Sequence, residues 1–244
     1  MKVCGITNVD DALACAAAGV EMIGLNFSPA SPRCVAASTA GEIIAATRPQ
    51  FPQVKFVGVF VDQDVAFVRQ LARDLALDAI QLHGNETVAD VLVAASGASV
   101  VAGVADPGEG RRGQALDQPG SPPPATTRTF VIKALRVAAQ LPTFADYAKE
   151  CDAILLDTWN ARTPGGTGET FPWSIAAELR PQVAQLILAG GLTSENVAEA
   201  IRMVRPFAVD VCSGVESAPG RKDEAKVRAF VGAVRAAVRG KMAR

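Results

Sequence analysis

The sequence lacks long hydrophobic runs and any excess of basic residues. No stretch of about 18 consecutive apolar residues occurs, so the sequence predicts no membrane-spanning helix. Lysine and arginine number 24 against 25 aspartates and glutamates, which gives a net charge of −1. A protein that binds duplex nucleic acid needs a concentrated basic surface to neutralise the phosphates. The near-neutral charge therefore argues against nucleic acid as the main partner.

Paired cysteines and histidine clusters are also missing. The 5 cysteines form no C-x-x-C pair, and an odd number of scattered cysteines suits free thiols in a reducing compartment better than a disulfide framework. The first residues, MKVCG, lack the basic-then-apolar profile of a secretory signal peptide. We therefore expect a cytoplasmic protein. Metal sites usually use several His, Cys or carboxylate ligands, so the single histidine, His83, makes a metal centre an unfavoured alternative.

Strand-like and helix-like segments alternate along the whole chain. Short runs rich in β-branched residues predict eight strands: Lys2–Gly5, Glu21–Phe27, Val54–Val61, Ala79–His83, Phe130–Val137, Ala153–Thr158, Leu186–Gly190 and Ala208–Ser213. Several are almost continuously apolar, which is typical of parallel strands covered on both faces. The alternation over 244 residues predicts a single (β/α)₈ barrel domain, residues 1–244, and disfavours an open doubly wound sheet, which usually has fewer strands.

Capping residues mark the expected limits of some helices. Asn8 is a suitable N-cap and Gly19 a suitable C-terminal stop for a helix over Val9–Ala18. A second helical segment, Ser194–Ile201, begins with Ser194 as a suitable cap residue, and Asp223–Arg239 has the pattern of a closing amphipathic helix.

A long segment before the fifth predicted strand departs from this regularity. Residues 106–129, DPGEGRRGQALDQPGSPPPATTRT, are rich in proline and glycine and poor in large apolar residues. Such a segment cannot bury enough apolar surface to offset the entropy cost of ordering it. We expect a flexible insertion on the face of the barrel away from the chemistry. A tolerated surface insertion is the favoured interpretation, and a docking segment is the alternative.

Polar residues recur where the predicted strands end. Barrel enzymes carry their reactive groups at the carboxyl ends of the strands and in the loops that follow. Because side chains alternate along a strand, the members of each of three pairs should share a face: Lys2 with Cys4, Gln81 with His83, and Asp210 with Cys212. Several inward polar groups at one end of the barrel indicate a polar site, because an unpaired buried polar group is costly.

Glycine-rich loops follow the last two predicted strands. Gly190 and Gly191 follow the seventh strand, and Ser213 and Gly214 follow the eighth. Barrels often bind phosphate with backbone N–H groups at these two places, and glycine lets the backbone approach an anion closely. The sequence therefore predicts a phosphate site formed by both loops. A further glycine-rich stretch, GGTG, follows the sixth strand.

An acid and a base can be proposed among these residues. Cys4 ends the first strand, where a thiolate could act as a base if a cation such as Lys2 lies nearby. Asp157 ends the sixth strand and could be an acid, a base or only the partner of Lys2. Arg33 could bind a substrate carboxylate, or it could be an exposed loop residue. Cys15, Cys34 and Cys151 are expected to be inert.

The motifs together resemble those of a known enzyme family. KVCGIT, NFSPASPR, VGVFV, QLHGNE, LLDT with GGTGETF, LAGGL and DVCSGVE occur in the order found in the phosphoribosylanthranilate isomerases of tryptophan biosynthesis. The resemblance covers all eight predicted strands and leaves only residues 106–129 outside it. KVCGIT, QLHG and DVxSGVE are specific in combination, whereas the glycine motifs alone are not.

The resemblance implies an Amadori rearrangement of N-(5′-phosphoribosyl)anthranilate that uses neither a metal nor an organic cofactor. Matched motif by motif, Cys4 would be the general base and Asp157 the general acid. Arg33 would face the anthranilate carboxylate. The remaining site residues implied are, in the pocket, Gln81, His83 and Asp210 and, at the phosphate, Gly190, Gly191, Ser213 and Gly214. The partner would be a small phosphosugar, and the enzyme a monomer or a homodimer.

Two other functions remain as alternatives. Another phosphosugar enzyme on the same barrel, such as a metal-dependent epimerase with a site around His83, Asp157 and Asp210, would lose activity with a chelator. A sensor that binds a phosphorylated ligand without turnover would have no use for both an acid and a base.

Overall fold

Eight parallel strands form a closed ring in the computed structural model, which describes residues 1–96, 128–137, 144–158 and 172–242. Each strand pairs with the next one along the chain, and the last pairs with the first, with Lys2 opposite Asp210. The strands are β1 (Lys2–Cys4), β2 (Met22–Asn26), β3 (Lys55–Phe60), β4 (Ala79–Leu82), β5 (Phe130–Val137), β6 (Ala153–Thr158), β7 (Leu186–Leu188) and β8 (Ala208–Val211). The predicted (β/α)₈ barrel is confirmed, and the open doubly wound sheet is wrong because the ring is closed.

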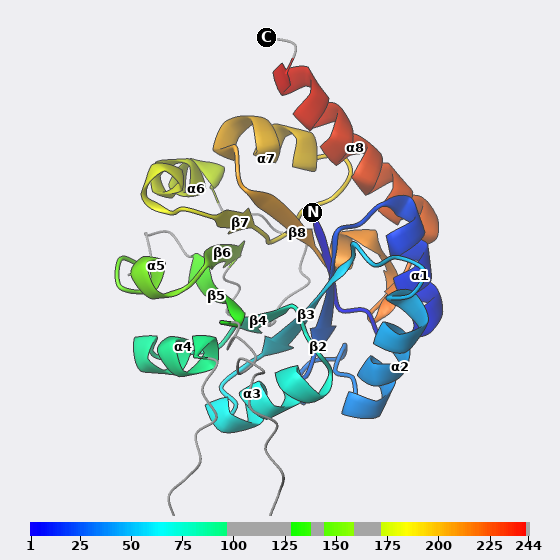
Figure 1. Cartoon of the computed structure of the whole chain (residues 1–244). Coiled ribbons are helices and arrows are strands. Elements are labelled where there is room, and N and C mark those ends of the chain that lie inside the picture. The colour runs from blue at the N-terminus through cyan, green and yellow to red at the C-terminus, as the bar shows by residue number, and fades with distance from the viewer. Residues whose placement is uncertain (97–127, 138–143, 159–171, 243–244) are drawn as a thin grey trace, which may run out of the picture.

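Helices surround the ring in chain order, as Figure 1 shows. They are α1 (Val9–Ala18), α2 (Ala37–Thr47), α3 (Val65–Asp74), α4 (Val88–Ala95), α5 (Tyr147–Glu150), α6 (Trp173–Leu179), α7 (Val197–Val204) and α8 (Glu224–Met242). Short 3₁₀ turns follow α6 (η1, Arg180–Gln182) and β8 (η2, Ser213–Val215), and a small hairpin of β9 (Glu216–Ala218) and β10 (Arg221–Lys222) leads into α8.

Two separate apolar cores hold these layers together. The larger lies between the strands and the helices and includes Ile23, Phe56 and Phe230. The smaller fills the inside of the barrel with residues such as Ile132 and Leu155. Strands buried on both faces need apolar residues at every position, which explains the continuously apolar runs in the sequence. The polar residues at the strand ends therefore stand out as exceptions to this packing.

Helix limits follow the capping residues in one case and not in another. Asn8 accepts a hydrogen bond from the Asp11 N–H, and Gly19 ends α1 in the left-handed conformation, so the prediction for this helix is confirmed. The prediction that Ser194 caps the later helix is wrong, because α7 begins at Val197 and its N-cap is Asn196. Asn196 uses its side chain in the preceding turn, where Oδ1 accepts a hydrogen bond from the Thr193 N–H. A local competition for backbone donors thus delays the helix.

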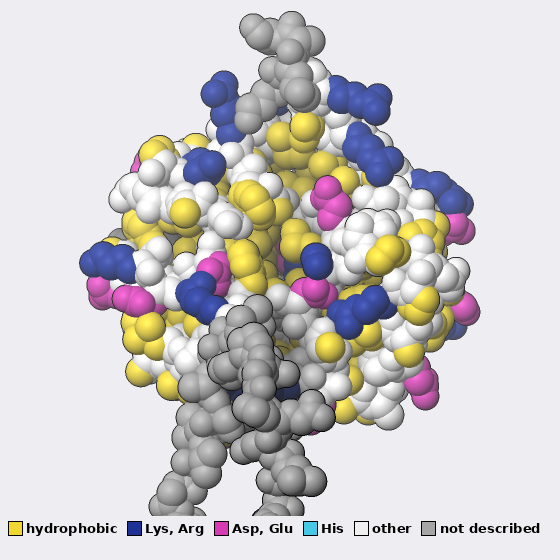
Figure 2. All heavy atoms as spheres, in the orientation of Figure 1, with side chains coloured by type: hydrophobic (Ala, Val, Ile, Leu, Met, Phe, Trp, Pro, Cys, Tyr) yellow, Lys and Arg dark blue, Asp and Glu magenta, His cyan; other side chains and the backbone are white. Residues whose placement is uncertain are grey.

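The proline- and glycine-rich segment predicted as a flexible insertion, residues 106–129, lies almost entirely outside the described residues, which resume at Arg128. Figure 2 shows Lys and Arg side chains spread around the rim of the face in view, with Asp and Glu side chains among them. This distribution agrees with the near-neutral net charge of −1. None of the helices among the described residues is long and apolar enough to cross a membrane.

Candidate active site

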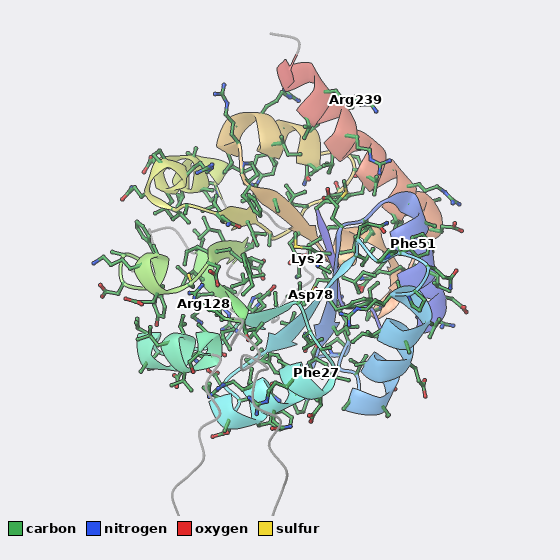
Figure 3. All side chains as sticks on the ribbon, viewed as in Figure 1. Lys2, Phe27, Phe51, Asp78, Arg128 and Arg239 are labelled. Carbon is green, nitrogen blue, oxygen red and sulfur yellow. The ribbon has the colours of Figure 1, made fainter. Side chains whose placement is uncertain are left out.

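Side chains alternate between the inside of the barrel and the helical layer along each strand. On β1, Val3 packs in the outer core, so Lys2 and Cys4 point into the barrel. Figure 3 shows Lys2 at the centre of the ring of strands. The same alternation turns inward the polar residues at the ends of three other strands: Gln81, His83, Asp157, Asp210 and Cys212. The predicted pairing of residues on one face therefore agrees with the strand geometry.

Lys2 and Asp210 form an ion pair inside the barrel. Lys2 Nζ lies 2.9 Å from Asp210 Oδ2, and the Lys2 side chain is fully buried. Burial raises the pKa of Asp210 to about 7, although the positive charge of Lys2 opposes this. Burial by itself would lower the pKa of Lys2, but the charges of Asp210 and Cys4 raise it above its ordinary value. Lys2 is therefore a permanent cation beside Cys4, and its partner is Asp210 rather than Asp157.

Cys4 has the environment of a reactive thiol. A hydrogen bond with the Cys212 thiol lowers the pKa of Cys4 well below its ordinary value, helped by the charges of Lys2 and Lys222 and opposed by burial. The same hydrogen bond and burial raise the pKa of Cys212 well above its ordinary value. The positive charges of Lys2 and Lys222 therefore favour the ionised form of Cys4. A thiolate is the form of cysteine that can accept a proton.

Asp157 is oriented by a chain of hydrogen bonds from β4. His83 Nε2 lies 3.2 Å from Asp157 Oδ2, and Gln81 Nε2 lies 2.8 Å from His83 Nδ1. The amide N–H of Gln81 donates to Nδ1, so the ring proton is on Nε2 and points at Asp157. The other carboxylate oxygen of Asp157 accepts a hydrogen bond from the Thr158 N–H at 2.8 Å. One carboxyl group is thus held at the mouth of the barrel.

Asp210 interacts electrostatically with both the Cys4 thiol and the Asp157 carboxyl group. The negative charges of both Cys4 and Asp157 act to raise the pKa of Asp210, so all three groups face the same interior. In the described part of the chain, Asp210 Oδ1 and Gln81 Oε1 are buried and have no hydrogen-bond partner. Buried acceptors without partners are rare in folded proteins, and these two could accept hydrogen bonds from the hydroxyl groups of a ligand.

Arg33 forms an ion pair with a residue that the sequence did not predict as part of the site. Its Nε and Nη2 donate to the two carboxylate oxygens of Glu216 at 2.8 and 2.6 Å, and Lys222 Nζ lies 2.8 Å from Glu216 Oε1. Arg33 crosses over Gly5, where a Cβ would lie 2.5 Å from its Cδ. Glu216 was visible in the DVCSGVE motif, but the sequence did not indicate its partner. Among the contacts of the described residues, both N–H groups of Nη1 and the second N–H of Nη2 are left for another anion.

A second unassigned ion pair lies behind the end of β4. Lys133 on β5 points toward the helical layer and lies 2.7 Å from Glu86 Oε2. Its Nζ also donates to the carbonyl oxygens of Leu82 and Gly84, at 3.4 and 2.8 Å. These carbonyl groups flank His83 on both sides. The ion pair therefore holds the backbone on both sides of His83. The sequence of β5 is mostly apolar, so it did not predict this ion pair.

The glycine loops after β7 and β8 pack against each other. Gly190 and Gly191 have φ of 85° and 62°, a region that favours glycine. A Cβ on Gly214 would lie 2.0 Å from the carbonyl oxygen of Leu192, so this position also has no room for a side chain. Ser213 begins η2 directly after β8. The structure thus brings together all four residues predicted for the phosphate site.

The described residues hold no cluster of three or more His, Cys, Asp and Glu side chains that could bind a metal ion. His83, Asp157 and Asp210, the set considered for a metal, instead have the protein partners given above. The GGTG stretch after the sixth strand lies outside the described residues.

The fold and these side chains define a class of protein, a (β/α)₈-barrel enzyme with a thiol and a carboxyl group at the carboxyl ends of its strands. Comparisons with known proteins narrow this class. The family model described as N-(5′-phosphoribosyl)anthranilate (PRA) isomerase matches residues 1–108 and 125–233. The chain belongs to this family of isomerases, as the sequence motifs predicted.

Individual relatives give the same result. An N-(5′-phosphoribosyl)anthranilate isomerase of Azotobacter vinelandii is 42% identical over 236 residues, which cover 96% of each chain. Monomers generated from the dimeric phosphoribosylanthranilate isomerase of Thermotoga maritima are 32% identical, with a TM-score of 0.73, over 96% of this chain and 97% of that one. A phosphoribosylanthranilate isomerase in complex with reduced 1-(o-carboxyphenylamino)-1-deoxyribulose 5-phosphate is 32% identical, with a TM-score of 0.71 over the same shares of the two chains.

Proposed function

We propose that this chain isomerises N-(5′-phosphoribosyl)anthranilate to 1-(2-carboxyphenylamino)-1-deoxyribulose 5-phosphate, with Cys4 as general base and Asp157 as general acid. The observation that carries the proposal is that Cys4 and Asp157 both point into the barrel from the ends of β1 and β6, with Lys2 on the same face as Cys4 and His83 Nε2 3.2 Å from Asp157. The solved relative with a reduced form of this product supports the choice of substrate.

The reaction needs a proton donor first. Asp157 in its protonated form gives a proton to the ring oxygen of the ribose, the bond between that oxygen and C1′ breaks, and the nitrogen lone pair forms the C1′ iminium ion. His83, which donates to Asp157 Oδ2 at 3.2 Å, holds the carboxyl group in one orientation for this step.

A proton acceptor completes the rearrangement. The Cys4 thiolate takes the proton from C2′, and the electron pair of that bond neutralises the iminium ion to give an enolamine. Tautomerisation of the enolamine gives the ketose product. The two groups come from β1 and β6, so they can act on different parts of one substrate.

Binding groups surround these two residues. Nη1 of Arg33 is proposed to face the anthranilate carboxylate, while Glu216 keeps the rest of the guanidinium in place. Gln81 Oε1 and Asp210 Oδ1 would accept hydrogen bonds from substrate hydroxyl groups. The phosphate is assigned to backbone N–H groups of the paired glycine loops, which contain Gly190, Gly191, Ser213 and Gly214.

Substitution of the acid and the base tests this proposal. Cys4→Ala and Asp157→Asn should each lower kcat by about a hundredfold or more while the substrate still binds. Turnover is followed by the loss of phosphoribosylanthranilate fluorescence, and binding by titration with the reduced product analogue. Near-normal turnover in either variant would contradict the assigned roles. Cys151→Ala, at a half-buried cysteine outside the barrel interior, is the matched control and should keep full activity.

The same assay separates the alternatives. Full activity in the presence of EDTA is expected for acid–base catalysis without a metal, whereas a metal-dependent epimerase would lose activity. A sensor would bind the analogue and leave the substrate unchanged. We also expect a monomer or a homodimer in the cytoplasm, with no nucleic acid partner. The dimeric relative from Thermotoga maritima supports a dimer as one of the two states.

A further inference from the structure

The backbone that carries the His83 imidazole is held by a side chain as well as by the sheet. β4 ends at Leu82, one residue before His83, and Leu82 pairs with Lys133 on β5. The N–H of His83 still donates to the carbonyl oxygen of Phe60 at 2.8 Å. The carbonyl oxygens on either side of it, those of Leu82 and Gly84, accept hydrogen bonds from Lys133 Nζ at 3.4 and 2.8 Å. Lys133 thus extends the hydrogen bonding of the sheet past the end of β4.

The ammonium group of Lys133 has three N–H donors, and three acceptors surround it. The third acceptor is Glu86 Oε2, at 2.7 Å. The side chains of Lys133 and Glu86 are only 2% and 3% exposed. An apolar pair of the same volume would often stabilise a fold as well as a buried ion pair does. The directed contacts of this pair therefore point to a role in geometry.

Glu86 holds the same turn from its other side. Its carboxylate accepts hydrogen bonds from the Gly84 N–H, at 3.0 and 2.9 Å to the two oxygens, and from the Asp62 N–H after β3, at 2.9 Å. Its backbone carbonyl accepts a hydrogen bond from the hydroxyl group of Tyr147 on α5, at 3.0 Å. The centre of the Tyr147 ring lies 5.8 Å from Lys133 Nζ. Groups from the loop after β3, from β5 and from α5 thus converge on the turn that follows β4.

We propose that Lys133 and Glu86 are positioning residues for the general acid: they hold the backbone of His83, whose ring in turn orients the carboxyl group of Asp157. The role in turnover rests on the proposed function. The His83 ring has two partners, with Nε2 3.2 Å from Asp157 Oδ2 and Nδ1 2.8 Å from Gln81 Nε2. A ring between two partners must keep both distances, so a small shift of its backbone breaks one of the contacts. A displacement of about 1 Å near a reacting group costs up to about a hundredfold in rate.

The nitrogen signals of His83, the only histidine of the chain, report the state of its ring without any turnover. Wild type and the double variant Lys133→Met, Glu86→Gln are labelled with ¹⁵N-histidine, and ¹H–¹⁵N correlation spectra are recorded at about pH 8, where an imidazole is mostly neutral. The double variant leaves no buried charge without its partner. The wild type should show the Nε2–H tautomer alone. The double variant should show a mixture of both tautomers, because the contacts at the two ring nitrogens loosen.

Steady-state kinetics supply a second readout. The double variant should lower kcat about tenfold and leave KM within about threefold of the wild-type value, because the proposed binding groups are unchanged. In a His83→Ala background the same double variant should change kcat by less than about twofold, since the ion pair acts through the ring.

Ile43→Val is the control for a loss of stability alone. Ile43 is buried on α2, which lies across the barrel from α5 (Figure 1). This variant should lower the melting temperature and leave both kcat and the His83 signals unchanged. Glu86→Asp replaces the double variant if that one does not fold, because it keeps the charge and shortens the side chain by one methylene group.

An unchanged His83 tautomer in a folded variant of the ion pair would overturn the proposal, and so would the same change of kcat with and without His83. Inactive wild-type protein would instead overturn the proposed function, and the His83 signals would still decide the role of Lys133 and Glu86.

Discussion

At the scale of single residues, the molecule is distinguished by charges that are buried and paired. Lys2 with Asp210, Lys133 with Glu86 and Lys222 with Glu216 each join a lysine to a carboxylate whose side chain is at most 8% exposed. Burying one charge without its partner is costly, so each pair constrains both of its members. These pairs lie around the strand ends, and they hold the residues that are proposed to face the substrate.

The pair inside the barrel makes stability depend on pH. Burial holds the pKa of Asp210 at about 7, above its unfolded value of about 3.9. The stabilising effect of this carboxyl group is therefore complete below the unfolded pKa and is lost as the pH rises to about 7. Removing Lys2 should raise the pKa of Asp210 further, so that the protein continues to lose stability as the pH rises above 7.

Lys2→Met should lower the free energy of unfolding by about 3 kcal/mol at pH 8.5 and by less at pH 6. The loss of Lys2 should also raise the pKa of Cys4, and this change lowers the free energy of unfolding further at pH 8.5. Urea denaturation at both pH values measures the effect. The double variant Lys2→Met, Asp210→Asn has no buried carboxylate and should lose less at pH 8.5. An equal loss at both pH values in the single variant would argue against this account.

At the scale of elements, the loops after β7 and β8 act as one unit. Gly214 lies against the carbonyl of Leu192, and Asn196 ties the β7 loop together by donating to the carbonyl of Gly191 at 2.9 Å. A side chain at position 214 must push the two loops apart. The positions of the backbone donors proposed to bind the phosphate depend on this contact.

Gly214→Ala should raise KM for the phosphorylated substrate about tenfold or more, because loss of one hydrogen bond to a charged group has this effect. Steady-state kinetics measure the change. Gly232→Ala is the matched control, since a Cβ on this glycine of α8 meets nothing within 4 Å. That variant should keep the wild-type KM and gain up to about 1 kcal/mol of stability. A normal KM in Gly214→Ala would exclude the phosphate role of this contact.

At the scale of the whole molecule, closure of the barrel assembles the site. The pairing of β1 with β8 brings the N-terminal Cys4 to Asp210 and Cys212, from the last strand and the position after it. The family model matches the chain on both sides of residues 109–124 and leaves those residues out. Because they fall within the segment predicted as a surface insertion, the barrel and its site should not depend on them.

Deletion of residues 109–124 should leave kcat/KM within about twofold of the wild-type value, as expected for a surface connection that contributes no site residue. The fluorescence assay on the shortened chain measures this, with circular dichroism as the check on folding. A large loss of activity in a folded variant would favour the docking or functional alternative for this segment.

Local patterns were sufficient for the elements and for much of the site. Apolar runs predicted all eight strands, and Asn8 and Gly19 predicted the limits of α1, because these signals act within a few residues. The capping signal failed at Ser194, because the side chain of Asn196 accepts a hydrogen bond from a backbone N–H of the turn before the helix. That Lys2 and Cys4 share a face followed from strand alternation alone.

The sequence by itself determined the barrel, the family and the polar residues that lie at or just after the strand ends. Only the tertiary structure decided which side chains interact: Lys2 with Asp210, Arg33 with Glu216 and Cys4 with Cys212. The physical reason is that these partners lie more than 180 residues apart and meet through strand register and ring closure. Periodicity and capping act over a few residues, so no local pattern specifies which distant charge will neutralise a buried one.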